Sequence, residues 1–132
     1  MPLTKLNQIS METTDKIVVI STTGPEFQEK ATLPFVVATA AQSVDAQVVI
    51  ILQASAVLLA KKGIAQNVNS PGLMPLKQLM DTFIELGGEL LICNPCIKER
   101  HIGEDELVPG AKPIAAGTVV TEVLSAKAVL TY

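Results

Sequence analysis

Residues 87–100 of the chain read GGELLICNPCIKER. The two glycines end an amphipathic helix that we predict over residues 75–86, where apolar side chains recur at helical spacing. Residues 89–92 then form a short strand that is apolar without alternation, and Cys93 and Cys96 follow at its carboxyl end. A strand of this kind is buried on both faces, which is typical of a parallel sheet covered by helices.

Working outward, the rest of the chain repeats this pattern of apolar runs separated by helical segments. Four further runs are predicted as strands: residues 16–22, 46–52, 113–116 and 127–132. Helical character is predicted for an Ala-rich stretch up to residue 43 and for residues 54–62, 103–107 and 118–125. Pro34 marks either the start of the first of these helices, with Thr32 near its cap, or a kink inside it. The alternation predicts a three-layer α/β/α fold with a largely parallel five-stranded sheet, whose strand order does not follow from the sequence.

The length of the chain leaves room for one domain. Its 132 residues contain no internal repeat, low-complexity segment or linker. Residues 1–14 lack a clear period and are expected to be a flexible or loosely docked tail, so the α/β domain is predicted over residues 15–132. No secretory signal is recognisable, and the mostly apolar run at residues 48–60 is too short to span a bilayer. We therefore expect a cytoplasmic protein whose cysteines are free thiols.

Composition excludes several classes of function. The chain has 10 Lys and Arg against 13 Asp and Glu, without a basic cluster, which argues against binding to nucleic acid or an anionic membrane. Aromatic residues make up 3% of the chain and Trp is absent, so stacking on bases or sugars is not expected. Because 48% of residues are apolar and only 17% are charged, we expect part of the surface to be buried against other copies of the chain.

The candidate site lies where the strands end. In an open α/β sheet, ligands gather at the carboxyl ends of the strands, and four segments are predicted to meet there: residues 22–24, 53–55, 93–96 and 116–118. Only the cysteine segment carries an obvious reactive group. Lys98 and Arg100 are expected to favour a thiolate, whereas the acidic residues 104–106 would oppose it.

Three uses of the cysteine pair are compatible with its chemistry, beside the interpretation that both are ordinary small residues. A zinc site would need ligands from another subunit or a carboxylate, because the chain offers two cysteines and one histidine. A dithiol redox pair fits the spacing, although the segment after the motif, residues 97–132, does not fit a thioredoxin fold. A thiolate that accepts a sulfur atom as a persulfide is also possible. The residues alone do not choose among these uses.

Other motifs are weaker. No Gly-rich nucleotide motif occurs, and Ser55 has no histidine or carboxylate at a spacing typical of a hydrolase. Gly24 and the threonines before it are candidates for binding an anion through backbone N–H groups. His101 is either a solvated side chain or a proton shuttle beside the thiolate.

Residues 91–100, LICNPCIKER, resemble the signature of DsrE/DsrF-like proteins. In that family a hydrophobic strand ends in Cys, and a basic residue, usually Arg followed by Gly, comes about two helical turns later. One subgroup has a second Cys three residues on. The end of the chain, residues 114–132, is similar to the last strand, helix and strand of the family, and the resemblance covers roughly residues 16–132. This sequence departs from the pattern at His101, where Gly is usual, so the turn beside the thiol is expected to differ.

The resemblance implies a cytoplasmic sulfur carrier or sulfurtransferase-like protein that assembles as a homotrimer or homohexamer. Cys93 would bear the persulfide, Cys96 would be a resolving or second thiol, and Arg100 with Lys98 would stabilise the thiolate. No cofactor is required, and the implied partners are sulfur donor and acceptor proteins. Two alternatives stay open: a non-catalytic oligomeric protein that binds a small ligand, and a C-x-x-C dithiol redox protein.

Overall fold

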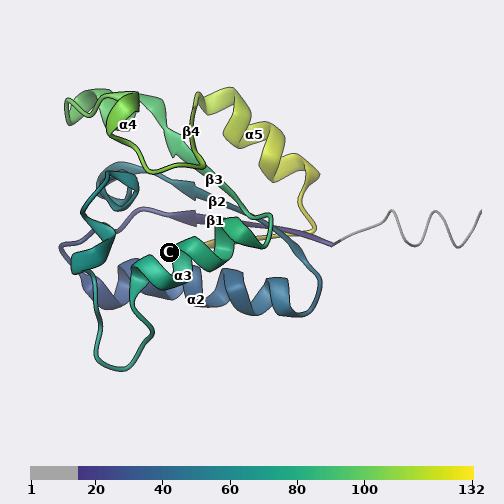
Figure 1. The fold of residues 1–132 in the computed structure, drawn as a ribbon. Coiled ribbons are helices and arrows are strands. Elements are labelled where there is room, and N and C mark those ends of the chain that lie inside the picture. The colour runs from purple at the N-terminus through teal and green to yellow at the C-terminus, as the bar shows by residue number, and fades with distance from the viewer. Residues whose placement is uncertain (1–14) are drawn as a thin grey trace, which may run out of the picture.

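The computed structural model describes residues 15–132, so the predicted tail lies outside the described residues. They form one five-stranded sheet in the order β4-β3-β2-β1-β5, in which all four neighbouring pairs are parallel (Figure 1). The strands are β1 (Lys16–Ser21), β2 (Gln47–Leu52), β3 (Glu89–Cys93), β4 (Ala111–Ile114) and β5 (Ala128–Thr131). The helices are α2 (Gln28–Ser43), α3 (Leu76–Glu85), α4 (Asn94–Glu99) and α5 (Ala116–Ser125), with short 3₁₀ helices η1 (Ala54–Ala60), η2 (Ala65–Asn67) and η3 (Glu104–Glu106).

Helices cover both faces of the sheet, which confirms the predicted three-layer architecture. Helices α2 and α3 lie on one face and α5 lies on the other (Figure 1). The larger apolar core fills the space under α2 and α3, and a smaller one under α5 contains Val18, Val49, Ile51, Leu91 and Ile114. Successive residues of a strand point to opposite faces, so the unbroken apolar runs of β1, β2 and β3 supply both cores.

Helix α3 forms where its pattern predicts. Its buried residues Leu76, Leu79, Met80 and Phe83 follow the 3-4-7 spacing of one helix face, and this face packs against the core. Gly87, with φ of +92°, follows its end in the left-handed conformation that glycine adopts without steric cost.

Helix α2 begins earlier than Pro34, which corrects one of the two expectations for that residue. The N–H of Ala31 already donates to the carbonyl of Phe27 at 2.9 Å, so the helix begins at Gln28 and Pro34 lies inside it, buried. The loop at Gly24 orients this start through the bond from the Phe27 N–H to the Gly24 carbonyl.

The end of the chain departs from the expected boundaries. The fourth strand is Ala111–Ile114 rather than residues 113–116, because its register pairs Ile114 with Cys93, and α5 begins at Ala116 rather than at residue 118. Strand β5 is exposed along its whole length, so the expectation that every strand is buried on both faces is wrong for this edge strand.

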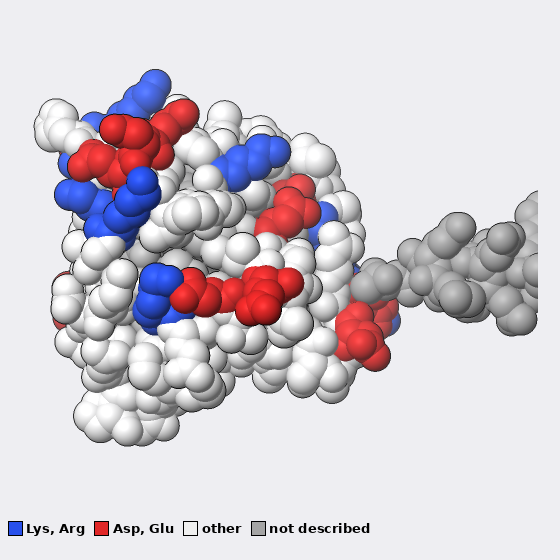
Figure 2. Space-filling model, in the orientation of Figure 1, with Lys and Arg blue, Asp and Glu red and all other residues white. Residues whose placement is uncertain are grey.

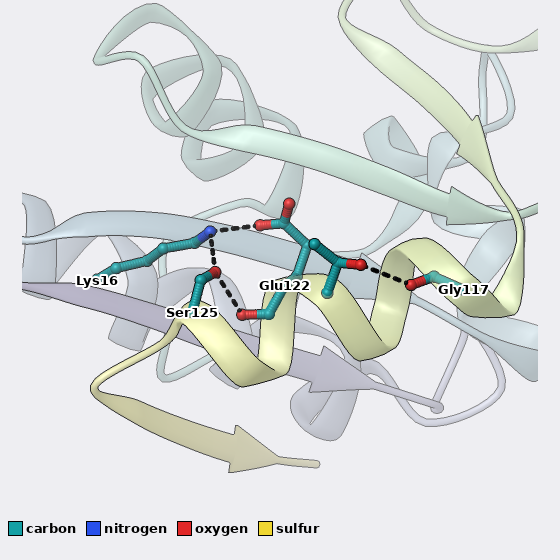
Figure 3. Close-up of polar contacts among 5 residues, drawn as sticks. Lys16, Gly117, Glu122 and Ser125 are labelled. Atoms are coloured by element: carbon teal, nitrogen blue, oxygen red, sulfur yellow. Dashed lines mark hydrogen bonds and ion pairs between the residues drawn. The ribbon is translucent and has the colours of Figure 1, made fainter.

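Helix α5 rests on the sheet by one partly apolar face and a polar anchor. It has no fully buried residue, although Val119 and Val123 pack against the smaller core. Lys16, the first residue of β1, pairs with Glu122 at 2.6 Å and donates to the Ser125 hydroxyl at 2.9 Å (Figure 3). Both ends of the ion pair are mostly shielded, with side-chain exposures of 17% and 19%. Among residues 15–132, no helix combines the length and apolar character needed to cross a bilayer.

Candidate functional site

The carboxyl ends of the strands meet at one edge of the sheet, as parallel pairing requires. The N–H of Gln53, after β2, donates to the carbonyl of Ser21 at the end of β1 at 2.9 Å. The N–H of Gly24, in the loop after β1, donates to the Ser55 hydroxyl at 3.1 Å. The N–H of Ala54 donates to the Cys96 sulfur at 3.2 Å. Three of the four segments predicted to gather are therefore joined by hydrogen bonds.

Cys93 lies in the wall of a cavity at this edge. It is the last residue of β3 and immediately precedes α4, and its side chain is half-buried. The cavity has a volume of about 240 Å³. Its other lining residues are Gln53, Pro95, Ile114, Ala115, Ala116, Val119 and Val120. The cavity thus joins Cys93 to the loop after β2 and to the start of α5, the fourth predicted segment.

Cys96 lies in the first turn of α4 and has a different environment. Its sulfur accepts the hydrogen bond from Ala54, a residue held in the left-handed conformation with φ of +51°. Its carbonyl accepts a hydrogen bond from the Arg100 Nη1 at 3.1 Å, one helical turn later. The α4 segment therefore brings together the three predicted site residues, Cys93, Cys96 and Arg100. The Arg100 guanidinium, however, donates to the backbone of Cys96 rather than to a thiol.

The electrostatic environment of Cys93 differs from the sequence prediction. Burial raises the pKa of its thiol, and a hydrogen bond with the Cys96 side chain raises it further. The Cys96 N–H and the Arg100 guanidinium lower the pKa, but burial and the second thiol outweigh them. The expectation that nearby cations give Cys93 a low pKa is therefore wrong, because it counted charges without burial. Lys98 is exposed.

The acidic residues after α4 have basic partners of their own. The Glu106 carboxylate accepts the N–H of Gly103 at 2.7 Å and lies 3.9 Å from the Lys61 Nζ. The Lys62 Nζ donates to the Asp105 carbonyl at 2.9 Å. Figure 2 shows charges of both signs gathered at the end of the molecule where α4 lies in Figure 1. These contacts place the acidic stretch in a mixed surface cluster.

Glu26 and Ser55 form a polar contact at the site that the sequence did not predict. The Ser55 hydroxyl donates to the Glu26 carboxylate at 2.6 Å, and the Gly24 N–H lies 3.1 Å from the same carboxylate oxygen. The Ser55 hydrogen bond holds the pKa of Glu26 below its ordinary value, and the charge of Arg100 also lowers it. A Cβ on Gly24 would lie 2.2 Å from the Ser55 carbonyl oxygen, so only glycine allows this approach. The sequence held no signal for this pairing, because the two loops meet only through the pairing of β1 with β2, which does not follow from the sequence.

Known protein families provide a comparison for this site and fold. The sequence pattern of the DsrE/DsrF-like family matches residues 15–132. The chain belongs to the DsrE/DsrF-like family.

Two relatives of this DsrE/DsrF-like chain are uncharacterized proteins. The chain is 32% identical over 118 residues to the uncharacterized protein MJ0989 of Methanocaldococcus jannaschii, covering 89% of this chain and 99% of that protein. It is 31% identical over 99 residues to the uncharacterized protein MK0008 of Methanopyrus kandleri, covering 74% and 78% respectively.

Two solved structures share the DsrE-like fold. The YchN protein of E. coli superposes with a TM-score of 0.75 at 20% identity, covering 90% of this chain and 100% of that one. The protein of unknown function MTH1491 of Methanobacterium thermoautotrophicum superposes with a TM-score of 0.64 at 9% identity, covering 89% of this chain and 99% of that one. These matches confirm the predicted fold.

His101 occupies the position at which the resemblance predicts glycine, and it adopts a left-handed conformation. Its φ is +55°, and its N–H donates to the Lys98 carbonyl at 3.1 Å as α4 ends. The N–H of Ile102 donates to the carbonyl of Ile97 at 2.9 Å, which completes the turn. A left-handed residue at this point favours glycine. The turn is a regular helix end, although a histidine occupies it, and its side chain is exposed.

Within the described part of the chain, no three His, Cys, Asp or Glu side chains gather in an arrangement that could hold a metal ion.

Proposed function

We propose that this protein carries sulfane sulfur as a persulfide on Cys93 and passes it to an acceptor thiolate. The observation that carries the proposal is the position of Cys93: a half-buried thiol at the carboxyl end of a parallel strand, in the wall of a cavity. Membership of the DsrE/DsrF-like family, which is associated with sulfur relay, supports it.

The transfer needs no cofactor, because it exchanges one sulfur–sulfur bond for another. The Cys93 thiolate attacks the outer sulfur of a donor persulfide, R–S–SH, and a new S–S bond forms as the donor bond breaks. The donor leaves as a thiolate and takes up the proton that Cys93 lost, so no net oxidation occurs. An acceptor thiolate then attacks the outer sulfur and restores the Cys93 thiol.

Cys96 and Arg100 have auxiliary roles in this scheme. Arg100 lowers the pKa of Cys93 and thereby opposes the effect of burial. Cys96 is a second thiol, three residues after Cys93, whose side chain raises the pKa of Cys93. As a second route of release, the Cys96 thiolate attacks the inner sulfur of the Cys93 persulfide, so that hydrosulfide leaves and a Cys93–Cys96 disulfide forms; two equivalents of an external thiol then reduce this disulfide to the two cysteines. Cys96 therefore accelerates release and is not required for loading.

A dithiol redox protein is the second candidate, and the closeness of the two thiols favours it. Both cysteines are free, and the Cys96 side chain is near enough to Cys93 to raise its pKa. Oxidation would remove two hydrogen atoms from the pair without adding sulfur, which distinguishes it from persulfide loading.

We further propose that the carrier works in the cytoplasm as a homotrimer or homohexamer, beside donor and acceptor proteins. Exposed apolar side chains support assembly. Of the nine large ones among residues 15–132, five lie on or after α5: Val120, Leu124, Val129, Leu130 and Tyr132. Such a surface fits burial against another copy.

The experiment is intact mass spectrometry of the reduced protein after exposure to a sulfane-sulfur donor. Wild type should gain one or more sulfur atoms that a reductant removes. Cys93→Ser should gain none, and Cys96→Ser should gain sulfur but release it more slowly. A loss of two hydrogens from wild type without sulfur gain would instead identify a redox pair. No change in any of the three would contradict both functions.

A further inference from the structure

We infer that the cavity beside Cys93 binds an uncharged, apolar substituent of a small persulfide donor. The donor would be a molecule R–S–SH whose group R lies against α5 while its outer sulfur meets Cys93. This inference rests on the proposed function and adds the chemical class of the substrate.

The walls of the cavity are apolar on nearly every side. Ile114 closes one side from the end of β4, and Val119 and Val120 line another from α5. Ala115 and Ala116 leave open space at the start of the helix, because their side chains are small. Among the described lining residues, Gln53 carries the one long polar side chain. Such walls bind hydrocarbon by removing it from water.

The size of the cavity limits its occupant to a small molecule. Its volume of about 240 Å³ is below the roughly 300–1,000 Å³ that is usual for drug-sized ligands. A short branched alkyl group and two sulfur atoms belong to the class of molecule that such a space admits.

The charges of the site lie elsewhere, which argues against an anionic donor. None of the described residues that line the cavity is charged. The Arg100 Nη1 donates to the Cys96 carbonyl, and its charge acts on Glu26 as well as on Cys93. A carboxylate or sulfonate on the donor would lose water inside the cavity without gaining a cation or a paired donor.

The reaction itself is the sulfur exchange already described. The Cys93 thiolate forms a bond to the outer sulfur of R–S–SH as the bond between the two donor sulfurs breaks. R–S⁻ leaves from the cavity side and takes up the proton released by Cys93. Binding of R orients the donor so that its outer sulfur, rather than its inner one, faces Cys93.

Three probes test the inference: hydrogen disulfide (HSS⁻), a branched butyl hydropersulfide, and the same hydropersulfide with a terminal carboxylate. The rate of sulfur loading is followed by intact mass and divided by the rate with a free cysteine derivative. For wild type, we expect this normalised loading rate to be at least about tenfold higher with the butyl probe than with the carboxylated probe.

Filling the cavity provides the matched pair of variants. Ala116→Leu places an uncharged side chain where the cavity opens, and should lower the ratio of the butyl loading rate to the hydrogen disulfide loading rate about tenfold. Gly117→Leu is the control, because a Cβ there meets no atom within 4 Å, and both rates should stay at the wild-type value. Val120→Ala, which widens the cavity, should raise the loading rate of hydropersulfides with larger R groups relative to that of the butyl probe.

The outcomes separate this inference from the proposed function. Failure of both hydrogen disulfide and the butyl probe to load Cys93 in wild type would contradict the sulfur carrier itself. Loading by hydrogen disulfide with equal rates for the butyl and carboxylated probes would overturn only the apolar donor. A third outcome is that Ala116→Leu changes the oligomeric state while all probes load at unchanged rates. This result would assign the cavity to a contact between subunits and would also overturn the apolar donor.

Discussion

The backbone N–H of Ala54 donates a hydrogen bond to the sulfur of Cys96, with 3.2 Å between the two atoms. Ala54 adopts φ of +51°, a conformation that costs a residue with a Cβ about 1 kcal/mol. The next residue, Ser55, is fixed by Gly24 and Glu26 and keeps the loop in this conformation. The two neighbouring thiols therefore have different partners: the Cys96 sulfur accepts from a fixed N–H donor, and Cys93 faces a cavity.

Replacing Ser55 by Ala should loosen this loop. The variant loses the hydrogen bonds between its hydroxyl, the Glu26 carboxylate and the Gly24 N–H, so the free energy of unfolding should fall by about 1–2 kcal/mol. Urea unfolding measures the change. Ser43→Ala is the control, because that exposed hydroxyl bonds only to a carbonyl of its own helix, and it should cost about 0.5 kcal/mol or less. Equal effects would show that Ser55 does not hold the loop.

The alkylation rate of Cys93 should still be rising at a pH where the rate of an ordinary thiol has levelled off. Its pKa is raised by burial and by Cys96, so the thiolate fraction at neutral pH is smaller than that of a free cysteine. Alkylation rates measured as a function of pH should therefore have a raised midpoint. Cys96→Ala should lower that midpoint, because it removes the second thiol. Arg100→Gln should raise it, because it removes a cation that favours the thiolate.

Lys98→Gln is the control for the pH profile, since this exposed lysine lies on the same helix as Arg100. Its midpoint should match that of wild type. A midpoint at or below that of a free cysteine in the wild-type protein would contradict the effect of burial.

Much of the fold could be predicted because its signals are local. Unbroken apolar runs and the helical spacing of residues 75–86 predicted the three layers and the parallel sheet. The strand order could not be predicted, since the spacing of strands along the chain does not determine which of them pair. The exposure of β5 was also missed, because an apolar edge strand has the same local pattern as a buried one.

The site could be predicted less completely, for a related reason. The position of Cys93 and Cys96 at a strand end follows from sequence neighbours, and the structure places them there. The raised pKa of Cys93 depends on burial, and the pairing of Glu26 with Ser55 depends on contact between two loops. Neither is visible in a motif, because the partners are brought together only by the fold.

Replacing His101 by Gly should stabilise the protein by about 0.5–1 kcal/mol. The residue is exposed and has φ of +55°, which glycine adopts without the clash of a Cβ. Thermal or urea unfolding measures the gain. Lys98→Gly, inside α4, should destabilise by a similar amount. If His101→Gly also lost sulfur loading, His101 would have a role in the chemistry rather than only in the turn.

The ion pair between Lys16 and Glu122 should contribute more to stability than the exposed pair between Lys127 and Asp15. The first pair is mostly shielded and orients α5 against β1, whereas the second has side-chain exposures of 70% and 61%. Lys16→Met should cost about 1–3 kcal/mol, and Lys127→Met about 0.5 kcal/mol or less. Urea unfolding of the two variants provides the comparison. Equal costs would contradict an anchoring role for Lys16.

The position of the transferred sulfur is the most direct test of a carrier that works through Cys93. The reduced protein is exposed to hydrogen disulfide, alkylated and digested, and tandem mass spectrometry places the added sulfur within the fragment that contains both cysteines. We predict added sulfur on Cys93 in wild type and in Cys96→Ala. Sulfur found on Cys96 in wild type, or on neither residue, would contradict the assignment of Cys93 as the carrier.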